Sequence, residues 1–314
     1  MECGRSTEHA LTSSPRLEGV YAPIPTPFTL GGEVDVDALR RNLARWAGSQ
    51  LSGYVALGST GEAPLLTEAE CVTVVREVRA YGLCGRVLLA GAGRQSTAAT
   101  QHAVEAVADA GADAALVLTP SYYRAATSED ALIEHFVAVA ASAPIPVIIY
   151  NMPACTGVDL SAAAVIRMSR AENIAGIKDS GGDLAKLAAI CAAVGDTFSV
   201  FAGSAGFFVP ALAAGASGGI LTLANIAPEA CLGMWRAASD GAWDDARRQQ
   251  ARLVELNTAV TRRWGVPGLK AAMDLVGLDG GAPRPPLKPL RGDALTELRR
   301  MLDCVVGPSG QEER

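Results

Sequence analysis

Segments with the apolar pattern of a β-strand alternate with segments that have the pattern of an α-helix, and this alternation repeats eight times from Val20 onward. The order of elements predicts an α/β fold, a parallel sheet whose strands are joined by helical crossovers. Eight units suit a closed (β/α)8 or TIM barrel. The alternative, an open doubly wound sheet, usually has fewer strands. The expected strands are residues 20–26, 53–57, 87–90, 114–118, 146–149, 174–177, 198–201 and 219–223.

Two similar joints between a helix and a strand support a regular barrel. Ala110-Gly-Ala-Asp-Ala-Ala-Leu116 resembles Ala214-Gly-Ala-Ser-Gly-Gly-Ile220, and each first glycine is expected just past a helix end, where φ is positive. After about residue 241 the pattern is purely helical, over residues 243–263, 267–276 and 293–302. We therefore predict a barrel at 19–240, an appended C-terminal helical layer at 241–306, and disordered tails at 1–18 and 307–314.

Charge and cysteine usage exclude several classes of function. The net charge is −6 and the chain has no basic cluster, so nucleic acid and anionic membrane are poor partners. An uncharged stretch at 197–228 is long enough to suggest a membrane span, but glycines and prolines divide it into short pieces. The seven cysteines are scattered and form no CxxC pair, and the first 18 residues lack an apolar signal region. These features favour reduced thiols and a cytoplasmic location.

The stretch Asn173-Ile-Ala-Gly-Ile-Lys-Asp-Ser180 places a lysine directly after a short apolar run that predicts a buried strand. Burial disfavours the ammonium form, so Lys178 is expected to offer a free amine as a nucleophile towards a carbonyl group. The alternative is a lysine that leaves the sheet and extends into solvent, and this stretch alone leaves both open.

Other expected strands also end in polar side chains, namely Ser59-Thr60, the pair Tyr122-Tyr123, and Tyr150. In a parallel barrel the chemistry lies at these strand ends. Together with Lys178 they are the residue types that imine chemistry needs: an amine, a phenol that transfers protons, and hydroxyl groups that hold a carboxylate. Each one alone could be structural, a core tyrosine or a residue that shapes a turn.

Three further sets of residues do not predict a hydrolase nucleophile, a dinucleotide-binding site or a metal site. Gly215-x-Ser217-x-Gly219 matches a nucleophile elbow, but here the helix precedes the strand. Gly91-x-Gly93 lacks the third glycine of a dinucleotide-binding motif and predicts close backbone packing or a turn. The histidines are isolated, and His102 and His135 are expected on helix surfaces. We therefore expect neither a metal nor a cofactor.

Four of these motifs together resemble the pyruvate-dependent class I aldolases of the dihydrodipicolinate synthase and N-acetylneuraminate lyase family. They are Gly58-Ser-Thr-Gly-Glu62, Thr119-Pro-Ser-Tyr-Tyr123, Tyr150-Asn-Met-Pro153 and Gly176-Ile-Lys-Asp-Ser180. The resemblance extends from about residue 17 to residue 290. Within the family the chain is most similar to the 4-hydroxy-2-oxoglutarate aldolase type, over Ile177-Lys-Asp-Ser-Gly-Gly-Asp183, Ala202-Gly-Ser-Ala-Gly-Phe207, Ala259-Val-Thr-Arg-Arg263 and Gly265-Val-Pro-Gly-Leu-Lys270.

The resemblance implies a role for each strand-end residue. Lys178 would form the Schiff base and Tyr150 would transfer protons, with Thr60 relaying them. Ser59 and Thr60 would bind the carboxylate of pyruvate. Tyr122, or else Tyr123, would complete the relay from a neighbouring subunit of a homotetramer or homodimer. The remaining substrate-binding positions that the resemblance implies are Ser180, Gly203 and Ile220.

Two positions depart from the family's patterns. Dihydrodipicolinate synthases usually carry an arginine, which grips the second substrate's carboxylate, where this chain has Cys155. A neutral thiol cannot replace a bidentate guanidinium, which counts against that synthase activity. The hydroxyoxoglutarate aldolase type has an asparagine where this chain has Thr60, so the recognition of glyoxylate stays open.

The leading hypothesis is a cofactor-free lyase that cleaves or forms a C–C bond in a 2-oxo acid, most simply 4-hydroxy-2-oxoglutarate to pyruvate and glyoxylate. The alternatives are a dihydrodipicolinate synthase or a sugar-acid aldolase of the same family. A hypothesis from another class is a non-enzymatic sensor of 2-oxo acids on the same scaffold. A sensor would have no use for the proton relay through Tyr150 and Thr60.

Overall fold

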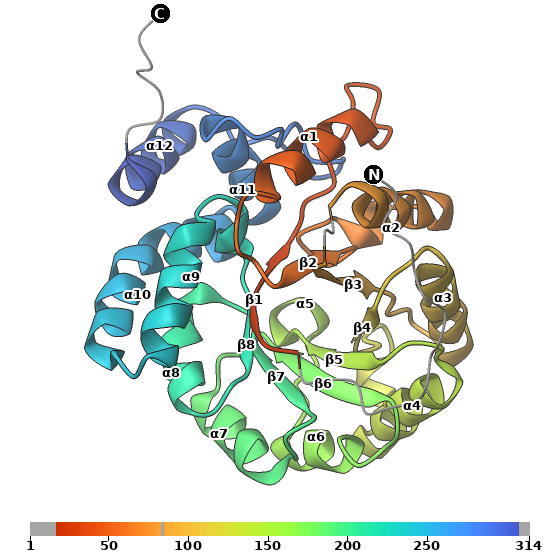
Figure 1. Ribbon diagram of the computed structural model, residues 1–314. Coiled ribbons are helices and arrows are strands. Elements are labelled where there is room, and N and C mark those ends of the chain that lie inside the picture. Colours follow the sequence, from red (N-terminus) through yellow and green to blue (C-terminus); the bar gives the residue numbers. More distant parts are fainter. Residues whose placement is uncertain (1–16, 83–84, 308–314) are drawn as a thin grey trace, which may run out of the picture.

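The computed structural model of the protein describes residues 17–82 and 85–307, and its eight parallel strands form a closed barrel (Figure 1). Each strand pairs with the next, and the last strand pairs with the first through Gly19 opposite Gly218. This closure confirms the predicted α/β (β/α)8 TIM barrel and excludes an open sheet. The strands are β1 (Gly19–Pro23), β2 (Gly53–Ala56), β3 (Val87–Gly91), β4 (Ala114–Leu118), β5 (Val147–Asn151), β6 (Ile174–Asp179), β7 (Ser199–Ala202) and β8 (Gly218–Ile220).

Helices surround the barrel, as Figure 1 shows, and polar side chains define where several of them begin. Asp35, Ser96, Ser128 and Asp183 each accept a hydrogen bond from a backbone N–H in the first turn. The capping box predicted at Thr67 and Glu70 is also present. The helices of the ring are α1 (Val36–Trp46), α2 (Glu68–Tyr81), α3 (Thr97–Asp109), α4 (Glu129–Ser142), α6 (Ala162–Met168), α7 (Leu184–Ala193), α8 (Phe208–Ala213) and α9 (Pro228–Ser239).

Apolar side chains fill two separate layers, one inside the barrel and one between the sheet and the helices. Inside, the rings of Tyr21 and Phe201 meet edge to face at 5.4 Å, and both are almost fully buried. The barrel is therefore a packed core and not a pore, and a ligand can only approach at the ends of the strands. As predicted, Gly111 and Gly215 follow helix ends with positive φ, at 105° and 101°.

The C-terminal helices lie outside the ring, next to α1 and α9 (Figure 1), which confirms the appended layer. They are α10 (Trp243–Thr258), α11 (Gly265–Leu275) and α12 (Asp293–Val306). We expected one helix over 243–263, but its last residues form a π-helical turn, η5 (Ala259–Arg263). The boundary between residues 240 and 241 stays a prediction. The expected tails, 1–18 and 307–314, lie almost entirely outside the described residues.

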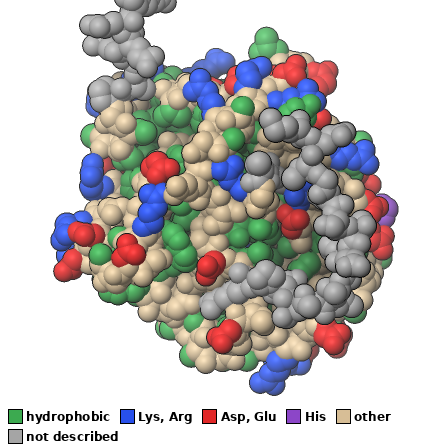
Figure 2. All heavy atoms as spheres, viewed as in Figure 1, with side chains coloured by type: hydrophobic (Ala, Val, Ile, Leu, Met, Phe, Trp, Pro, Cys, Tyr) green, Lys and Arg blue, Asp and Glu red, His purple; other side chains and the backbone are tan. Residues whose placement is uncertain are grey.

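The uncharged stretch at 197–228 forms β7, β8 and the short helices between and after them, and no helix among the described residues could span a bilayer. On the face in Figure 2, acidic and basic side chains are interspersed. Cys71, Cys155, Cys231 and Cys304 are free thiols, whereas Cys3 and Cys84 lie outside the described residues. Within the described part of the chain, no group of three or more potential metal-ligating side chains occurs.

Candidate active site

Lys178 lies near the end of β6 and its side chain is only 4% exposed. Its partners in the sheet are Tyr150 of β5 and Phe201 of β7, two residues of the packed interior. The lysine Nζ is 4.1 Å from the centre of the Tyr150 ring. The sequence left open a lysine that extends into solvent, and the structure excludes it. None of the ion pairs among the described residues involves Lys178. Its uncharged state stays a prediction.

The residues that follow Tyr150 and Lys178 point to the opposite side of the sheet and form a network of their own. Asn151 donates from Nδ2 to Asp179 at 2.8 Å and to Asp159 at 2.6 Å. Lys186 lies 3.0 Å from Asp179 and 2.6 Å from Asp159. Burial works against the charge of Lys186, but its two carboxylate partners outweigh burial and raise its pKa. The carboxylate of Asp179 is thus neutralised by Lys186 and is not the counter-ion of Lys178.

The loop after β2 carries Ser59 and Thr60 in a constrained backbone. Leu57 has φ of 58°, a left-handed conformation that is rare for a branched side chain and is found most often at functional sites. The Leu57 carbonyl oxygen is 1.8 Å from the position that a Cβ atom on Gly91 would take. Gly91-x-Gly93 therefore serves close backbone packing, as predicted. Thr60 Oγ1 faces Thr222 Oγ1 at 3.4 Å. Among the described residues no hydrogen bond joins Thr60 to Tyr150, and the proton relay between these two residues stays a prediction.

A buried ion pair, which the sequence did not reveal, fixes the other end of this loop. Glu62 has φ of 58°, and its Oε1 lies 2.6 Å from Nζ of Lys270 on α11. The exposed fractions of the two side chains are 1% and 0%. The backbone N–H of Arg284 donates to Glu62 Oε2 at 2.8 Å, and the Thr26 hydroxyl donates to the carbonyl oxygen of Gly61 at 2.7 Å.

Ser180 and Gly203 lie against each other where β6 and β7 end. A Cβ atom on Gly203 would stand 2.0 Å from Ser180 Oγ and 2.8 Å from the backbone oxygen of Asp179. The backbone N–H of Gly203 donates to that same oxygen at 2.7 Å. Only glycine allows this close approach, which explains the residue type at position 203.

A cavity of about 570 Å³ opens at this rim and brings most of the predicted residues together. Ser59, Thr60, Tyr150, Lys178 and Ser180 all line it, as does Gly203. Ile220 does not, because it lies fully buried in the barrel interior. Cys155, which stands where the synthases usually carry an arginine, also lines the cavity. The other residues of the wall were not assigned to the site from the sequence, and they are Met152, Pro153, Ala154, Gly181, Ser204, Thr222, Val260, Thr261, Arg262, Gly265, Val266 and Leu269. Of these, Arg262 has a charged side chain.

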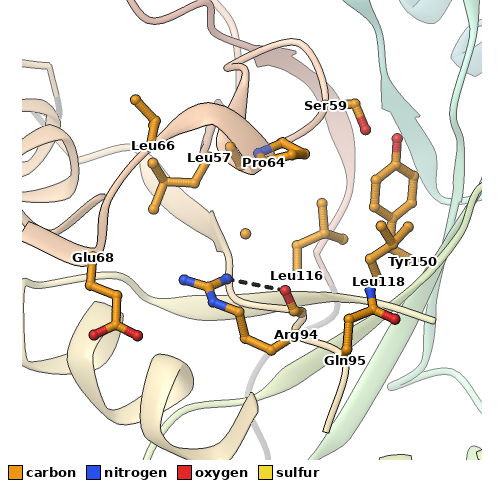
Figure 3. A pocket seen from close by; sticks show the side chains of 14 residues that line it. Leu57, Ser59, Pro64, Leu66, Glu68, Arg94, Gln95, Leu116, Leu118 and Tyr150 are labelled. Carbon is orange, nitrogen blue, oxygen red and sulfur yellow. Dashed lines mark hydrogen bonds between the residues drawn. The ribbon is translucent and has the colours of Figure 1, made fainter. Parts of the chain in front are cut away.

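A second cavity, of about 300 Å³, adjoins the first and shares Ser59 and Tyr150 with it. Figure 3 shows its lining, with the guanidinium group of Arg94 and the carboxylate of Glu68 on the side away from Tyr150. Arg94 Nη1 donates to the carbonyl oxygen of Gly93 at 3.1 Å.

The two tyrosines expected to complete the relay lie outside both cavities. Tyr122 is 79% exposed and Tyr123 is 74% exposed, and their rings meet edge to face at 5.0 Å. The Tyr122 backbone N–H donates to Gln95 Oε1 at 2.9 Å, which holds the loop in place while the ring extends into solvent. Within one subunit Tyr122 therefore does not join the other site residues.

The structure also bears on two further residues, Ser217 as a possible nucleophile and His135 as an expected helix-surface residue. Ser217 precedes β8, and its Oγ accepts a hydrogen bond from the Val200 N–H at 2.8 Å, so it does not occupy a nucleophile elbow. His135 was expected on a helix surface, and this was wrong. It is only 7% exposed, and its Nδ1 lies at hydrogen-bond distance, 2.9 Å, from the Thr97 hydroxyl group. Burial lowers the pKa of the His135 ring.

Comparison with known proteins shows extensive similarity. The sequence model of the protein family described as "Dihydrodipicolinate synthetase family" matches residues 16–304 of this chain. The 4-hydroxy-tetrahydrodipicolinate synthase of Methanothrix thermoacetophila is 37% identical, covering 94% of this chain and 99% of that protein. A probable mitochondrial 4-hydroxy-2-oxoglutarate aldolase of Emericella nidulans is 35% identical, covering 88% and 91%. The crystal structure of a dihydrodipicolinate synthase from Bacillus anthracis has a TM-score of 0.88 at 29% identity, covering 92% and 99%.

Proposed function

Because this chain belongs to the dihydrodipicolinate synthetase family and is a lyase of the aldolase type, we propose that it joins or cleaves a 2-oxo acid through a Schiff base on Lys178. The observation that carries the proposal is the lysine itself. It is buried, it lies against the ring of Tyr150, and it opens into the cavity at the strand ends. In this proposal the amine of Lys178 is the nucleophile that attacks the carbonyl carbon of the 2-oxo acid.

We propose 4-hydroxy-2-oxoglutarate as the substrate, cleaved to pyruvate and glyoxylate. The Lys178 amine adds to C2 and water leaves, which gives a protonated imine. A base removes the proton of the C4 hydroxyl, the C3–C4 bond breaks, and its electron pair moves into the imine to form an enamine. Glyoxylate departs, C3 takes up a proton, and hydrolysis releases pyruvate and the free lysine. The reverse sequence joins the two products.

The side chains around Lys178 have the properties that these steps need. We assign to the Tyr150 phenol the transfer of protons to and from the imine and the C4 oxygen, because its ring centre lies 4.1 Å from Nζ of Lys178. Ser59 and Thr60, on the constrained loop, provide hydroxyl groups and backbone N–H groups for the pyruvate carboxylate. Ser180 offers a further hydroxyl group beside the lysine. This scheme uses only groups of the protein itself and needs no cofactor.

The choice of 4-hydroxy-2-oxoglutarate as the substrate rests on Cys155 in the cavity wall and on the similarity to known proteins. Cys155 lines the cavity where a dihydrodipicolinate synthase would offer an arginine, and a neutral thiol gives the second substrate's carboxylate no ionic partner at that place. The similarity to a fungal hydroxyoxoglutarate aldolase supports the aldolase alternative. The second candidates remain the synthase and a sugar-acid aldolase, and the names of the relatives support the synthase.

We also propose that the enzyme works as a homotetramer or homodimer. Tyr122 and Tyr123 are large rings held out into solvent by a loop at the same rim as the cavity. Such rings favour insertion into a partner subunit. We assign the relay to Tyr122, which would approach Thr60 of a neighbouring subunit. The cytoplasmic location stays a prediction.

The test is a panel of 4-hydroxy-2-oxo acids, sugar acids and the synthase substrate pair, scored by release or consumption of pyruvate. We expect the highest kcat/KM for 4-hydroxy-2-oxoglutarate. A higher value for another substrate class would replace our choice of substrate. Tight binding of 2-oxo acids without any turnover would instead favour the sensor.

A further inference from the structure

We propose that Arg262 determines specificity by binding the second carboxylate of a dicarboxylic substrate, the one farthest from the imine. This inference rests on the proposed function, because it assigns the distal end of the substrate whose C2 reacts with Lys178. It starts from the part of the cavity wall that does not come from the barrel at all.

The π-helical turn η5 brings Arg262 into the wall. The Trp264 N–H donates to the carbonyl oxygen of Ala259 at 2.9 Å, a bond that spans five residues instead of four. The turn thus holds one more residue than a regular helix would, and such turns occur frequently at functional sites. Val260, Thr261 and Arg262 of this turn all line the cavity.

The charge of the cavity favours a substrate with two negative groups. Among the described residues that line it, Lys178 and Arg262 are the two with basic side chains, and no carboxylate is present. Lys178 is used in forming the imine, which leaves the guanidinium group of Arg262 for an anion. A guanidinium group binds a carboxylate through two parallel hydrogen bonds.

Arg262 differs in this respect from the arginine beside it. Arg263 forms two hydrogen bonds with Glu297, at 2.6 and 2.8 Å, and lies 4.5 Å from the centre of the Trp264 ring. It does not line the cavity. Arg262 is exposed, and it takes part in none of the ion pairs found in the described ranges. One arginine of the pair is thus held by the protein surface, while the other faces the site.

The depth of the cavity decides which carboxylate Arg262 can reach. Lys178 is buried, and it lines the same cavity as the Ser59 and Thr60 hydroxyl groups that we assign to the first carboxylate. Arg262 is exposed and comes from the outer helical layer, so it lies towards the mouth. A substrate with C2 at Lys178 directs its far end there. Cys155, in the same wall, provides no charge that could do this instead.

Two other arginines near the rim are poorer candidates. Arg94 lines the smaller adjoining cavity and donates to the backbone of Gly93, its own neighbour. Arg124 lines neither cavity and is exposed. Arg262 is therefore the arginine that shares one cavity with the reactive lysine.

The experiment compares Arg262→Gln with Arg263→Gln, a matched control that removes one positive charge at the next position. Each variant is assayed with 4-hydroxy-2-oxoglutarate and with 4-hydroxy-2-oxopentanoate, in which a methyl group replaces the distal carboxylate. Because a hydrogen-bonded charge pair is lost, Arg262→Gln should lower kcat/KM for the dicarboxylate by about 10- to 100-fold. The monocarboxylate should change by less than about threefold, and Arg263→Gln should leave both values nearly unchanged.

Arg262→Lys, which keeps the charge but not the two-pronged geometry, should retain an intermediate preference. An equal loss on both substrates, or no loss on the dicarboxylate, would overturn the role of Arg262 while the proposed function stands. If wild-type protein formed no borohydride-trapped adduct with pyruvate and released none from either substrate, the proposed function would fail and this inference with it.

Discussion

Removing one partner of the Glu62–Lys270 ion pair should destabilise the protein and should also weaken its binding of the pyruvate carboxylate. The two charges lie 2.6 Å apart, and neither side chain has more than 1% of its surface exposed. The lysine Nζ also donates to the backbone oxygens of Thr26 and Ala282, at 2.8 and 3.2 Å. Lys270→Met therefore leaves a buried carboxylate without its counter-charge and two carbonyl groups without their donor.

The size of the effect follows from this burial. Breaking one side of a fully buried ion pair costs about 3–5 kcal/mol, a large part of the roughly 5–15 kcal/mol that stabilises a domain. In a chain of this size the melting temperature should fall by about 6–20 °C, at roughly 2–4 °C for each kcal/mol. Glu62→Gln should destabilise the protein by a similar amount. Burial lowers the pKa of Lys270 and the Glu62 carboxylate opposes that shift, so the variant leaves the buried ammonium group without its counter-charge. The double variant should cost clearly less than the sum of the two.

The functional effect should appear in pyruvate binding, because Glu62 ends the loop that carries Ser59 and Thr60. The concentration of pyruvate needed for half-maximal trapping by borohydride should rise in either single variant. The stabilities are measured by calorimetry and denaturant titration of all four proteins. Arg41→Gln, which breaks an exposed pair with Asp279, is the control and should change stability by less than about 1 kcal/mol. Single variants as stable as the control, or fully additive effects, would refute the reasoning.

Three further predictions follow from individual contacts. Tyr150→Phe removes the acid/base group and should lower kcat by about 10²- to 10⁴-fold in a steady-state assay; near-normal turnover would contradict its role. Gly203→Ala places a methyl group 2.0 Å from Ser180 Oγ, so it should destabilise the protein by about 1–3 kcal/mol in denaturant titration; wild-type stability would speak against this close approach. The hydrogen bond from Arg284 lowers the pKa of Glu70 from 4.5 to about 2. A carboxyl group with a lowered pKa stabilises the fold above its ordinary pKa, and that contribution is lost as the pH falls from about 4.5 towards 2. Glu70→Gln should flatten this part of the melting-temperature profile, and an unchanged profile would argue against the pairing.

The fold could be predicted because its main determinant is local. Eight apolar runs separated by helical patterns leave few arrangements for a parallel sheet. The positive φ angles predicted for the glycines after two helix ends, Gly111 and Gly215, are confirmed. The C-terminal π-helical turn could not be predicted, since a regular helix and a π-helical turn share nearly the same apolar pattern. The burial of His135 was missed for a similar reason. Periodicity does not reveal that Thr97, on another helix, offers its ring a hydrogen bond.

The candidate site could be predicted as far as it comes from strand ends. Lys178 and Tyr150 are direct partners in the sheet, so the barrel that the sequence predicts places them together. Thr222 and Arg262 were not assigned, because their place in the wall depends on how a loop and the outer helices pack over the rim. The pairing of Glu62 with Lys270 depends on the same packing. The Tyr122 ring faces solvent within one subunit, so its predicted role in the relay depends on a neighbouring subunit.

The most direct test of the central claim is to identify the atom to which pyruvate becomes attached. Protein incubated with pyruvate and borohydride should gain roughly 72 Da, the mass of pyruvic acid less water plus two hydrogens, in one adduct per chain. Peptide mapping should place that mass on Lys178, and Lys178→Ala should gain none. A wild-type protein without the adduct, or an adduct of the same mass that persists in Lys178→Ala, would contradict the account.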